Sequence, residues 1–211
     1  RKVTFNASSN GGSCSTASLD STATVTYSLN GWYTAKSGGT QRVRGGTSYT
    51  PSATETLYAQ WGSSTGTYSQ VTLPAATKSN GTATRTVTFN GNGGSTPSAL
   101  KSNATITYSQ TGWFTSASGG TSRGNSGTKY TPSAAETLYA QFSSSTGSYS
   151  AITLPTPTRT DYIFKGWSTD PNATSGITGS YTQSGNVTLY ATWVEDQAKA
   201  KVRVDGAWKN G

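Results

Sequence analysis

The chain has 211 residues, of which 31% are apolar and only 11% are charged, and it is rich in Ser, Thr and Gly. Such low hydrophobicity is typical of disordered chains, but 6 Trp, 12 Tyr and 5 Phe argue for a folded protein, since each ring can bury about 150–250 Å². The absence of His excludes the usual Ser/His and Cys/His nucleophile pairs and the usual zinc sites. We therefore predict that the chain is not an enzyme and uses no cofactor or metal.

The net charge of +8 raises the question of nucleic-acid binding. The Lys and Arg residues are scattered singly, which favours a solvated surface and predicts no nucleic-acid partner. Attraction to acidic cell-wall polymers or anionic glycans stays open. The single cysteine, Cys14, excludes an intramolecular disulfide, and no apolar run is long enough to span a membrane. With no initiator Met and no leader-like segment, we expect a processed product or a piece of a longer chain.

Short segments with alternating side-chain character predict strands along the chain. The first, at residues 3–5, precedes an Asn-Gly-Gly turn signal at 10–12. Further strands are predicted at 24–28 and 31–34, and the Thr- and Tyr-bearing segment 56–61 closes the series. Because such strands and Gly turns continue to the end of the repeats, we predict an all-β or mainly β fold with little or no helix.

The same motifs return further along the chain, which indicates a repeat architecture. The recurring pairs are VTFNASSNGG at 3–12 with VTFNGNGG at 87–94, ATVTYS at 23–28 with ATITYS at 104–109, and TYSQVTLP at 67–74 with SYSAITLP at 148–155. A Gly-Trp pair and a closing strand occur three times, at 31–32 and 56–61, at 112–113 and 137–142, and at 166–167 and 188–193. The third copy has no VTFN motif of its own and is therefore interpreted as shortened.

These repeats predict three modules, at residues 1–64, 65–145 and 146–194. The polar junctions between them are too short to act as flexible linkers, so adjacent modules are expected to be close-set. Residues 195–211 differ in character and predict the start of a further β-hairpin element or a tail, with a turn at Asp205-Gly206.

Five aromatic positions recur in register in every copy. The rings persist while neighbouring polar residues change, so we predict that they pack in the core of each module. The predicted core rings are Tyr27, Trp32, Tyr49, Tyr58, Trp61, Tyr108, Trp113, Tyr130, Tyr139, Phe142, Tyr162, Trp167, Tyr181, Tyr190 and Trp193. Tyr33 and Phe114, directly after Gly-Trp, are the candidate exposed rings that could contact a ligand.

Glu55 and Glu136 occupy equivalent positions before the closing strand, and Val187 takes that position in the third copy. A glycoside hydrolase needs two carboxylates across one cleft, whereas each copy supplies at most one. We interpret both acids as exposed strand residues beside Lys or Thr. They are also the candidate acids for an intramolecular Lys–Asn isopeptide bond, which a loss of mass would reveal. The Asn-Gly runs lack the carboxylates of a calcium loop and are interpreted as turns.

The ordered pattern VTFN.NGG, Y...GWYT...GGT and TLYAQW resembles the Listeria–Bacteroides repeat, also called the internalin B-repeat. The resemblance covers roughly residues 3–193, and TRTDYIFKGW at 158–167 is its closest match. It implies small β-grasp-like modules in an elongated tandem array, carried by secreted or surface-attached bacterial proteins. Such modules act as spacers or adhesion segments and contribute no catalytic residues.

Three functions are compatible with these observations. The first is a stiff, non-catalytic spacer or adhesion segment of an extracellular bacterial surface protein. The second is a phage virion decoration or fibre protein, which the terminal VRVDGAWK segment at 202–209 motivates. The third is a carbohydrate-binding module. The expected partner is another protein, a second copy of the chain, or a cell-wall or glycan surface.

Overall fold

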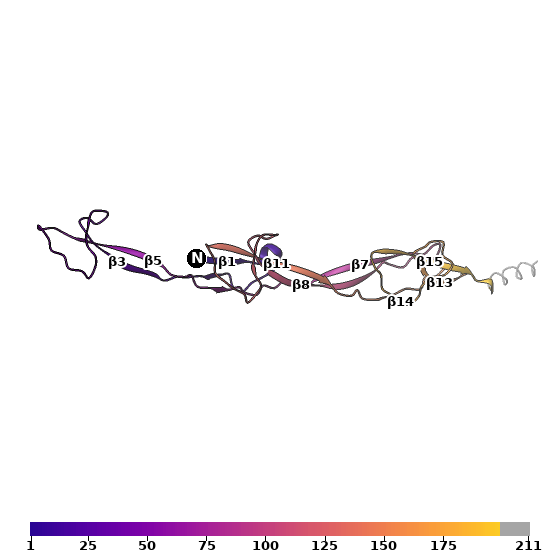
Figure 1. Cartoon of the computed structure of the whole chain (residues 1–211). Coiled ribbons are helices and arrows are strands. Elements are labelled where there is room, and N and C mark those ends of the chain that lie inside the picture. The colour runs from indigo at the N-terminus through magenta and orange to yellow at the C-terminus, as the bar shows by residue number, and fades with distance from the viewer. Residues whose placement is uncertain (199–211) are drawn as a thin grey trace, which may run out of the picture. The chain divides into compact units, whose positions relative to one another are not determined.

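The computed structural model describes residues 1–198, and Figure 1 shows that they form mainly strands. Apart from one 3₁₀ turn at Ser8–Asn10, the elements described between residues 1 and 196 are strands, which confirms the predicted β class. The chain divides into two compact units, one of residues 1–78 and 110–142 and one of residues 79–109 and 143 onward. The units therefore do not follow the predicted module ranges, because each one combines segments from two sequence repeats.

The first unit contains eight strands of its own, and two longer strands have residues in both units. The eight are β1 (Lys2–Asn6), β2 (Ser18–Asp20), β3 (Val25–Tyr33), β4 (Gln41–Val43), β5 (Tyr58–Thr65), β6 (Val71–Thr72), β9 (Ser122–Gly124) and β10 (Lys129–Tyr130), with the turn η1 (Ser8–Asn10) after β1. The two longer strands are β8 (Leu100–Phe114) and β11 (Glu136–Thr146). The largest sheet has the order β13 (Tyr162–Ser168), β15 (Val187–Glu195), β7 (Gly81–Asn90), β8, β11, β1 and β2, and β9 pairs with β8.

In the first unit, β1 pairs in parallel with β11 and antiparallel with β2. Its register places Val3 opposite Glu136 and Phe5 opposite Leu138. The VTFN motif of the first repeat thus pairs with the closing strand of the second repeat. The short strands β6 and β10 pair beside this core, and Leu73 after β6 is buried within it.

The second unit repeats this arrangement with later segments. Its strands are β7 (Gly81–Asn90), β12 (Ile152–Thr153), β13 (Tyr162–Ser168), β14 (Ser180–Tyr181) and β15 (Val187–Glu195). Strand β7 pairs in parallel with β15, with Val87 opposite Val187 and Phe89 opposite Leu189. The third repeat is therefore not incomplete as predicted, because the second repeat supplies its VTFN strand.

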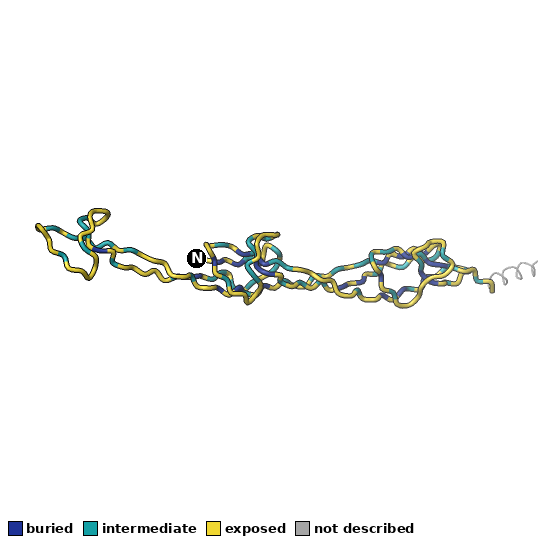
Figure 2. Tube along the Cα trace, viewed as in Figure 1, coloured by how far each residue is buried: buried dark blue, intermediate teal, exposed yellow. Residues whose placement is uncertain are grey.

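Strands β3, β4 and β5 form a separate three-stranded sheet in the order β4-β3-β5. The β3–β5 ladder runs from the pair Val25–Thr65 to the pair Tyr33–Tyr58, with a register shift between Leu29 and Gly31. We call residues 25–65 the tip hairpin. Figure 2 shows it almost entirely as exposed or intermediate, in contrast to the dark buried positions of the two cores.

Two predictions concern segments beyond these cores. The predicted hairpin with its turn at Asp205-Gly206 lies outside the described residues. Within residues 1–198, no helix is long and apolar enough to cross a membrane.

Candidate functional surface

The core of the first unit is built around Trp113, which is 0% exposed. The ring of Phe5 from β1 lies edge-on against it, with 4.9 Å between ring centroids. The indole Nε1 donates a hydrogen bond of 2.7 Å to the carbonyl of Pro74. Leu138 and Ala140 of β11 complete the cluster and are fully buried. One module core therefore needs a VTFN strand, a Leu-Pro segment, a Gly-Trp segment and a closing strand.

The second unit has the same core from equivalent residues. Trp167 is 1% exposed, and its ring centroid lies 4.6 Å from that of Phe89. Its Nε1 donates to the carbonyl of Pro155 at 2.7 Å. Leu189 and Ala191 of β15 are fully buried beside it. The two units therefore build the same core from equivalent residues, with the same hydrogen-bond acceptor and similar ring distances.

The tip hairpin carries a Gly-Trp segment and a closing strand but no VTFN strand. Trp32 is 39% exposed and Trp61 is 61% exposed, while Leu57 and Ala59 are only half-buried. Tyr27, further along β3, is 71% exposed. The prediction that Tyr27, Trp32 and Trp61 are core rings is therefore wrong. The reason is that no described VTFN strand pairs with this closing strand, whereas β1 pairs with β11 and β7 with β15 and their Phe rings pack on the equivalent tryptophans.

Of the other predicted core rings, Trp113 and Trp167 are buried, and the rest occupy intermediate positions with one further exception. Tyr162 is 37% exposed and lies under Arg159, whose guanidinium carbon is 3.7 Å from the ring centroid, so its assignment to the core was also wrong. Half-buried are Tyr49, Tyr58, Tyr108, Tyr130, Tyr139, Phe142, Tyr181, Tyr190 and Trp193. Tyr33 and Phe114, the predicted contact rings, are half-buried as well. The exposed rings of the tip hairpin are instead three of the predicted core rings, namely Tyr27, Trp32 and Trp61.

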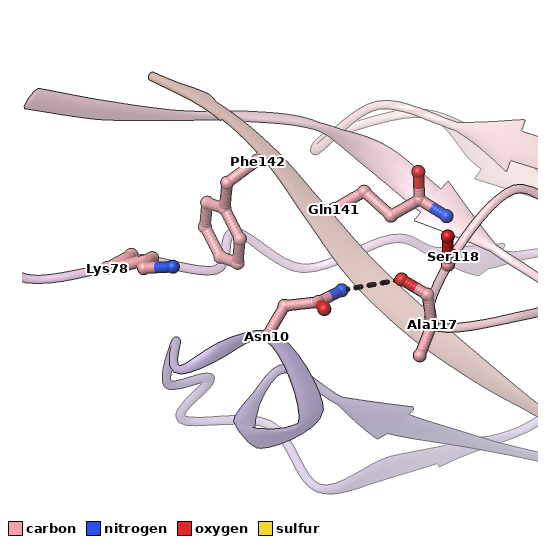
Figure 3. A pocket seen from close by; sticks show the side chains of 6 residues that line it. All are labelled: Asn10, Lys78, Ala117, Ser118, Gln141 and Phe142. Atoms are coloured by element: carbon pink, nitrogen blue, oxygen red, sulfur yellow. Dashed lines mark hydrogen bonds between the residues drawn. The ribbon is translucent and has the colours of Figure 1, made fainter. Parts of the chain in front are cut away.

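An asparagine side chain holds each VTFN turn to the Gly-Trp loop. Figure 3 shows Asn10 pointing towards the loop at Ala117, beside the ring of Phe142. Its amide Nδ2 donates to the carbonyl of Ala117 at 2.9 Å and to the carbonyl of Ala140 at 2.8 Å. Lys78 lines the same shallow pocket. Because the polar groups here bond to one another across the module, the pocket is part of the packing.

The second unit repeats this contact through Asn92, whose Nδ2 donates to the carbonyls of Pro171 at 3.0 Å and Ala191 at 3.2 Å. The interpretation of the Asn-Gly-Gly runs as turns missed this bridging role. A signal for it was present in the sequence, because Asn10 and Asn92 both stand two residues before the second glycine of the run.

Some of the scattered basic residues take part in packing. Arg1 lies with its guanidinium carbon 3.6 Å from the ring centroid of Tyr68, and Arg85 lies 3.7 Å from that of Tyr149. Each arginine stands two residues before the Val of a VTFN motif and also donates to a backbone carbonyl of its own unit. These cation–π contacts are a structural use of charge, which the interpretation as a merely solvated surface did not include.

Glu136 accepts two side-chain hydrogen bonds in the first unit. Arg123 Nε donates to its Oε2 at 3.2 Å, and the hydroxyl of Tyr130 donates to its Oε1. Burial and this hydrogen bond raise the pKa of Tyr130 to about 12. The acid therefore pairs with Arg and Tyr rather than with Lys or Thr as expected.

The tip hairpin contains the same cluster around Glu55. Arg42 Nε donates to Glu55 Oε2 at 3.0 Å, and the hydroxyl of Tyr49 donates to Oε1. The hydrogen bond from Tyr49 lowers the pKa of the Glu55 carboxyl and raises the pKa of the tyrosine. Each cluster joins one glutamate to one arginine and one tyrosine. Such a set of contacts is better suited to holding the loop in place than to acid–base catalysis. Among residues 1–198, no group of three His, Cys, Asp or Glu could hold a metal ion.

Comparison with protein families gives a match over most of the chain. The model of the Listeria-Bacteroides repeat domain matches residues 2–60, 86–141 and 144–192. Comparisons with curated proteins and with solved structures found no match. Each matched segment ends at a closing strand, so the family's repeat unit and the packed core share an end but differ in where they begin.

Proposed function

Because the chain belongs to the Listeria-Bacteroides repeat family, whose members are typical of extracellular or surface proteins of bacteria, we propose that it is a non-catalytic, load-bearing spacer in such a protein. The proposal gives the spacer role expected from the sequence a specific physical basis. The observation that carries it is the parallel pairing of the first and last strands of each core, β1 with β11 and β7 with β15.

Parallel pairing matters because of where a pulling force enters and leaves. In a parallel pair, the N-terminal end of one strand and the C-terminal end of the other lie at opposite ends of the ladder. A pull on the chain before β1 and after β11 therefore drags the strands along each other and loads their hydrogen bonds together. A pull on the two N-terminal ends would instead open the bonds one after another.

The repetition of the core supports the same function. The buried Trp, Leu and Ala positions of the two units are identical, while nearby polar residues differ, as when Val187 replaces the glutamate at Glu136. What recurs is thus the packing, which a spacer requires. The adhesion role and the extracellular location are also part of this proposal, and the family match is what supports them. No described residue favours a virion role.

Force measurements on single molecules test the proposal directly. In a Cys14→Ser background, we attach one handle at Arg1 and the other at Ser144→Cys, which shears β1 against β11. The matched control moves the second handle to Ala135→Cys, which peels the same strands apart from one end. We expect a several-fold higher rupture force in the shear geometry, since forced unfolding follows the unfolding rate along the pulled direction. Equally low forces in both geometries would contradict the proposed role.

A further inference from the structure

The tip hairpin contains half of a module core without the other half. Trp32, Leu57, Ala59 and Trp61 occupy the positions of Trp113, Leu138, Ala140 and Phe142 in the first unit. Trp113, Leu138 and Ala140 are fully buried and Phe142 is half-buried against the turn after β1, whereas Trp32 and Trp61 are exposed and Leu57 and Ala59 are half-buried. We call these four tip residues the acceptor face, and we call a VTFN strand with its Asn-Gly-Gly turn a donor segment.

The loop behind the acceptor face already has the conformation of a complete module. Gln60 Nε2 donates to the carbonyls of Ala35 at 3.0 Å and Gly38 at 2.7 Å. Gln141 makes the equivalent two bonds in the first unit at 3.0 and 2.7 Å. The Tyr–Glu–Arg cluster is present in both places as well. A preorganised surface loses little ordering entropy on binding, so the face is ready for an added strand.

The edge that a donor segment would join is open. In the three-stranded sheet of the tip, β5 is an edge strand. It begins only at Tyr58, whereas β11 begins at Glu136, the equivalent of Glu55. Residues 55–57 thus form no ladder with any described strand, although the same residues of β11 pair with β1. An unpaired edge beside exposed apolar rings is a template for strand addition.

We propose that the tip hairpin binds a Val-Thr-Phe-Asn donor segment from a further repeat of the same family, as an added parallel strand. The register follows from the two units, with the donor Val opposite Glu55 and the donor Phe opposite Leu57. The turn asparagine donates to the carbonyls of Lys36 and Ala59, which correspond to the acceptors of Asn10 and Asn92. A Leu-Pro segment beside the donor supplies the carbonyl that the indole of Trp32 needs.

This occupant is favoured because the chain fills the same face twice in this way. Both strand edges equivalent to residues 55–57 are paired with a VTF strand in one register, and the Phe of that strand packs on the equivalent tryptophan. A second copy of the chain has no spare donor, since its β1 and β7 are already paired with β11 and β15. A glycan could stack on Trp32 and Trp61, but it would leave the strand edge at residues 55–57 unpaired.

The first experiment adds a peptide of residues 85–98 to the full chain. Binding is followed through the indole N–H signals of Trp32 and Trp61, which Trp→Phe variants identify. We expect both signals to shift, and we expect Val87→Thr with Phe89→Thr in the peptide to weaken binding at least about tenfold, because both apolar contacts are lost. Ala59→Arg in the chain blocks the acceptor face, since its equivalents Ala140 and Ala191 are fully buried, and should abolish the shifts.

A second variant removes the dependence on peptide affinity. The donor peptide, followed by residues 148–157 to supply the Leu-Pro segment, is fused ahead of Arg1 through a flexible Gly/Ser linker, which gives a high effective concentration. We expect Trp32 and Trp61 to become protected from acrylamide quenching, and we expect the Val87→Thr, Phe89→Thr donor to leave them as accessible as in the chain alone.

Several outcomes would overturn the proposal. One is a fused donor that leaves Trp32 and Trp61 accessible. Another is a peptide that shifts Trp113 or Trp167, which would mean that it displaces a resident strand. Concentration-dependent self-association that shifts Trp32 and Trp61 without any donor would assign the face to a second copy. Glycan binding at these rings by a chain that ignores the donor would assign the face to a carbohydrate. None of these results depends on the load-bearing role, which the pulling experiment tests separately.

Discussion

The second glycine of each VTFN turn lies directly against the last ring of a closing strand. A Cβ added at Gly12 would stand 2.6 Å from Cζ of Phe142, and one at Gly94 would stand 2.5 Å from Cζ2 of Trp193. The indole Nε1 of Trp193 also donates to the carbonyl of Gly91 at 2.9 Å. Glycine is thus required at these positions for close approach of a ring, in addition to any turn geometry.

Gly94→Ala should lower the free energy of unfolding of the second unit by about 1–3 kcal/mol, since the ring and the carbonyl of Thr158 must both move. Denaturant unfolding followed by tryptophan fluorescence measures the change. Gly185→Ala in the same unit is the matched control, because no atom lies near its added Cβ. An equal loss for both variants would show that the close approach of the Trp193 ring does not set the requirement for glycine at position 94.

The phenol of Tyr130 gives the first unit a defined response to alkaline pH. Its pKa is about 12, against 10.0 for an ordinary tyrosine, because burial and the bond to Glu136 both disfavour the phenolate. A raised folded-state pKa contributes stability that is complete below pH 10 and is lost as the pH rises towards 12. We expect the ultraviolet titration of tyrosinate to lose one late-titrating group in Tyr130→Phe. Glu136→Gln should move that group to lower pH, and an unchanged titration in both variants would contradict the assignment.

At the scale of the element, the same closing-strand sequence occurs three times, buried in two copies and half-buried in the third. Leu57, Leu138 and Leu189 stand at the same position of the TLYA motif. Leu138 and Leu189 are fully buried in strands that pair with β1 and β7, whereas Leu57 is half-buried on the tip hairpin. The motif therefore does not determine its own burial, which depends on whether a donor strand arrives.

Truncating these three leucines to alanine should give unequal costs. We expect Leu138→Ala and Leu189→Ala to lower the free energy of unfolding by about 2–5 kcal/mol, and Leu57→Ala to lower it by roughly 1 kcal/mol or less, because little apolar area is lost there. Equilibrium unfolding in urea compares the three variants. Similar losses at all three positions would indicate that the tip face is covered in solution.

The elements could be predicted from sequence because their signals are local. Alternation placed the strands, and the ring positions placed Trp113 and Trp167 in what are now two buried clusters. The partner of each VTFN strand could not be predicted in this way. Both the first and the second closing strand offer β1 the same Glu-Thr-Leu-Tyr-Ala sequence, so local patterns do not distinguish them. For the same reason the exposed Trp32 and Trp61 resembled core residues.

At the scale of the whole molecule, each VTFN strand pairs with the closing strand of the next repeat, and we call this the offset pairing. Crosslinking can test it. Thr4 lies opposite Thr137 in the β1–β11 ladder, and Thr56 is the equivalent residue of the first closing strand. In a Cys14→Ser background, Thr4→Cys with Thr137→Cys should oxidise to an intramolecular disulfide, since neighbouring strands lie about 4.7–4.9 Å apart.

The matched control is Thr4→Cys with Thr56→Cys, which should stay reduced under the same conditions. Peptide mapping by mass spectrometry without reduction identifies the bridge. A bridge in the control chain, with none in the first variant, would mean that each sequence repeat closes on itself.

The offset also has a consequence for how the protein is made. Strand β1 leaves the ribosome long before β11, so the first core cannot close until residues 136–142 have been synthesised. The same delay separates β7 from β15 in the second core. Contacts of such long sequence separation fold slowly and leave strands unpaired in the meantime. During synthesis the closing strand of each VTFN strand's own repeat is therefore available before its native partner exists, and the chain must avoid that shifted pairing to reach the native one.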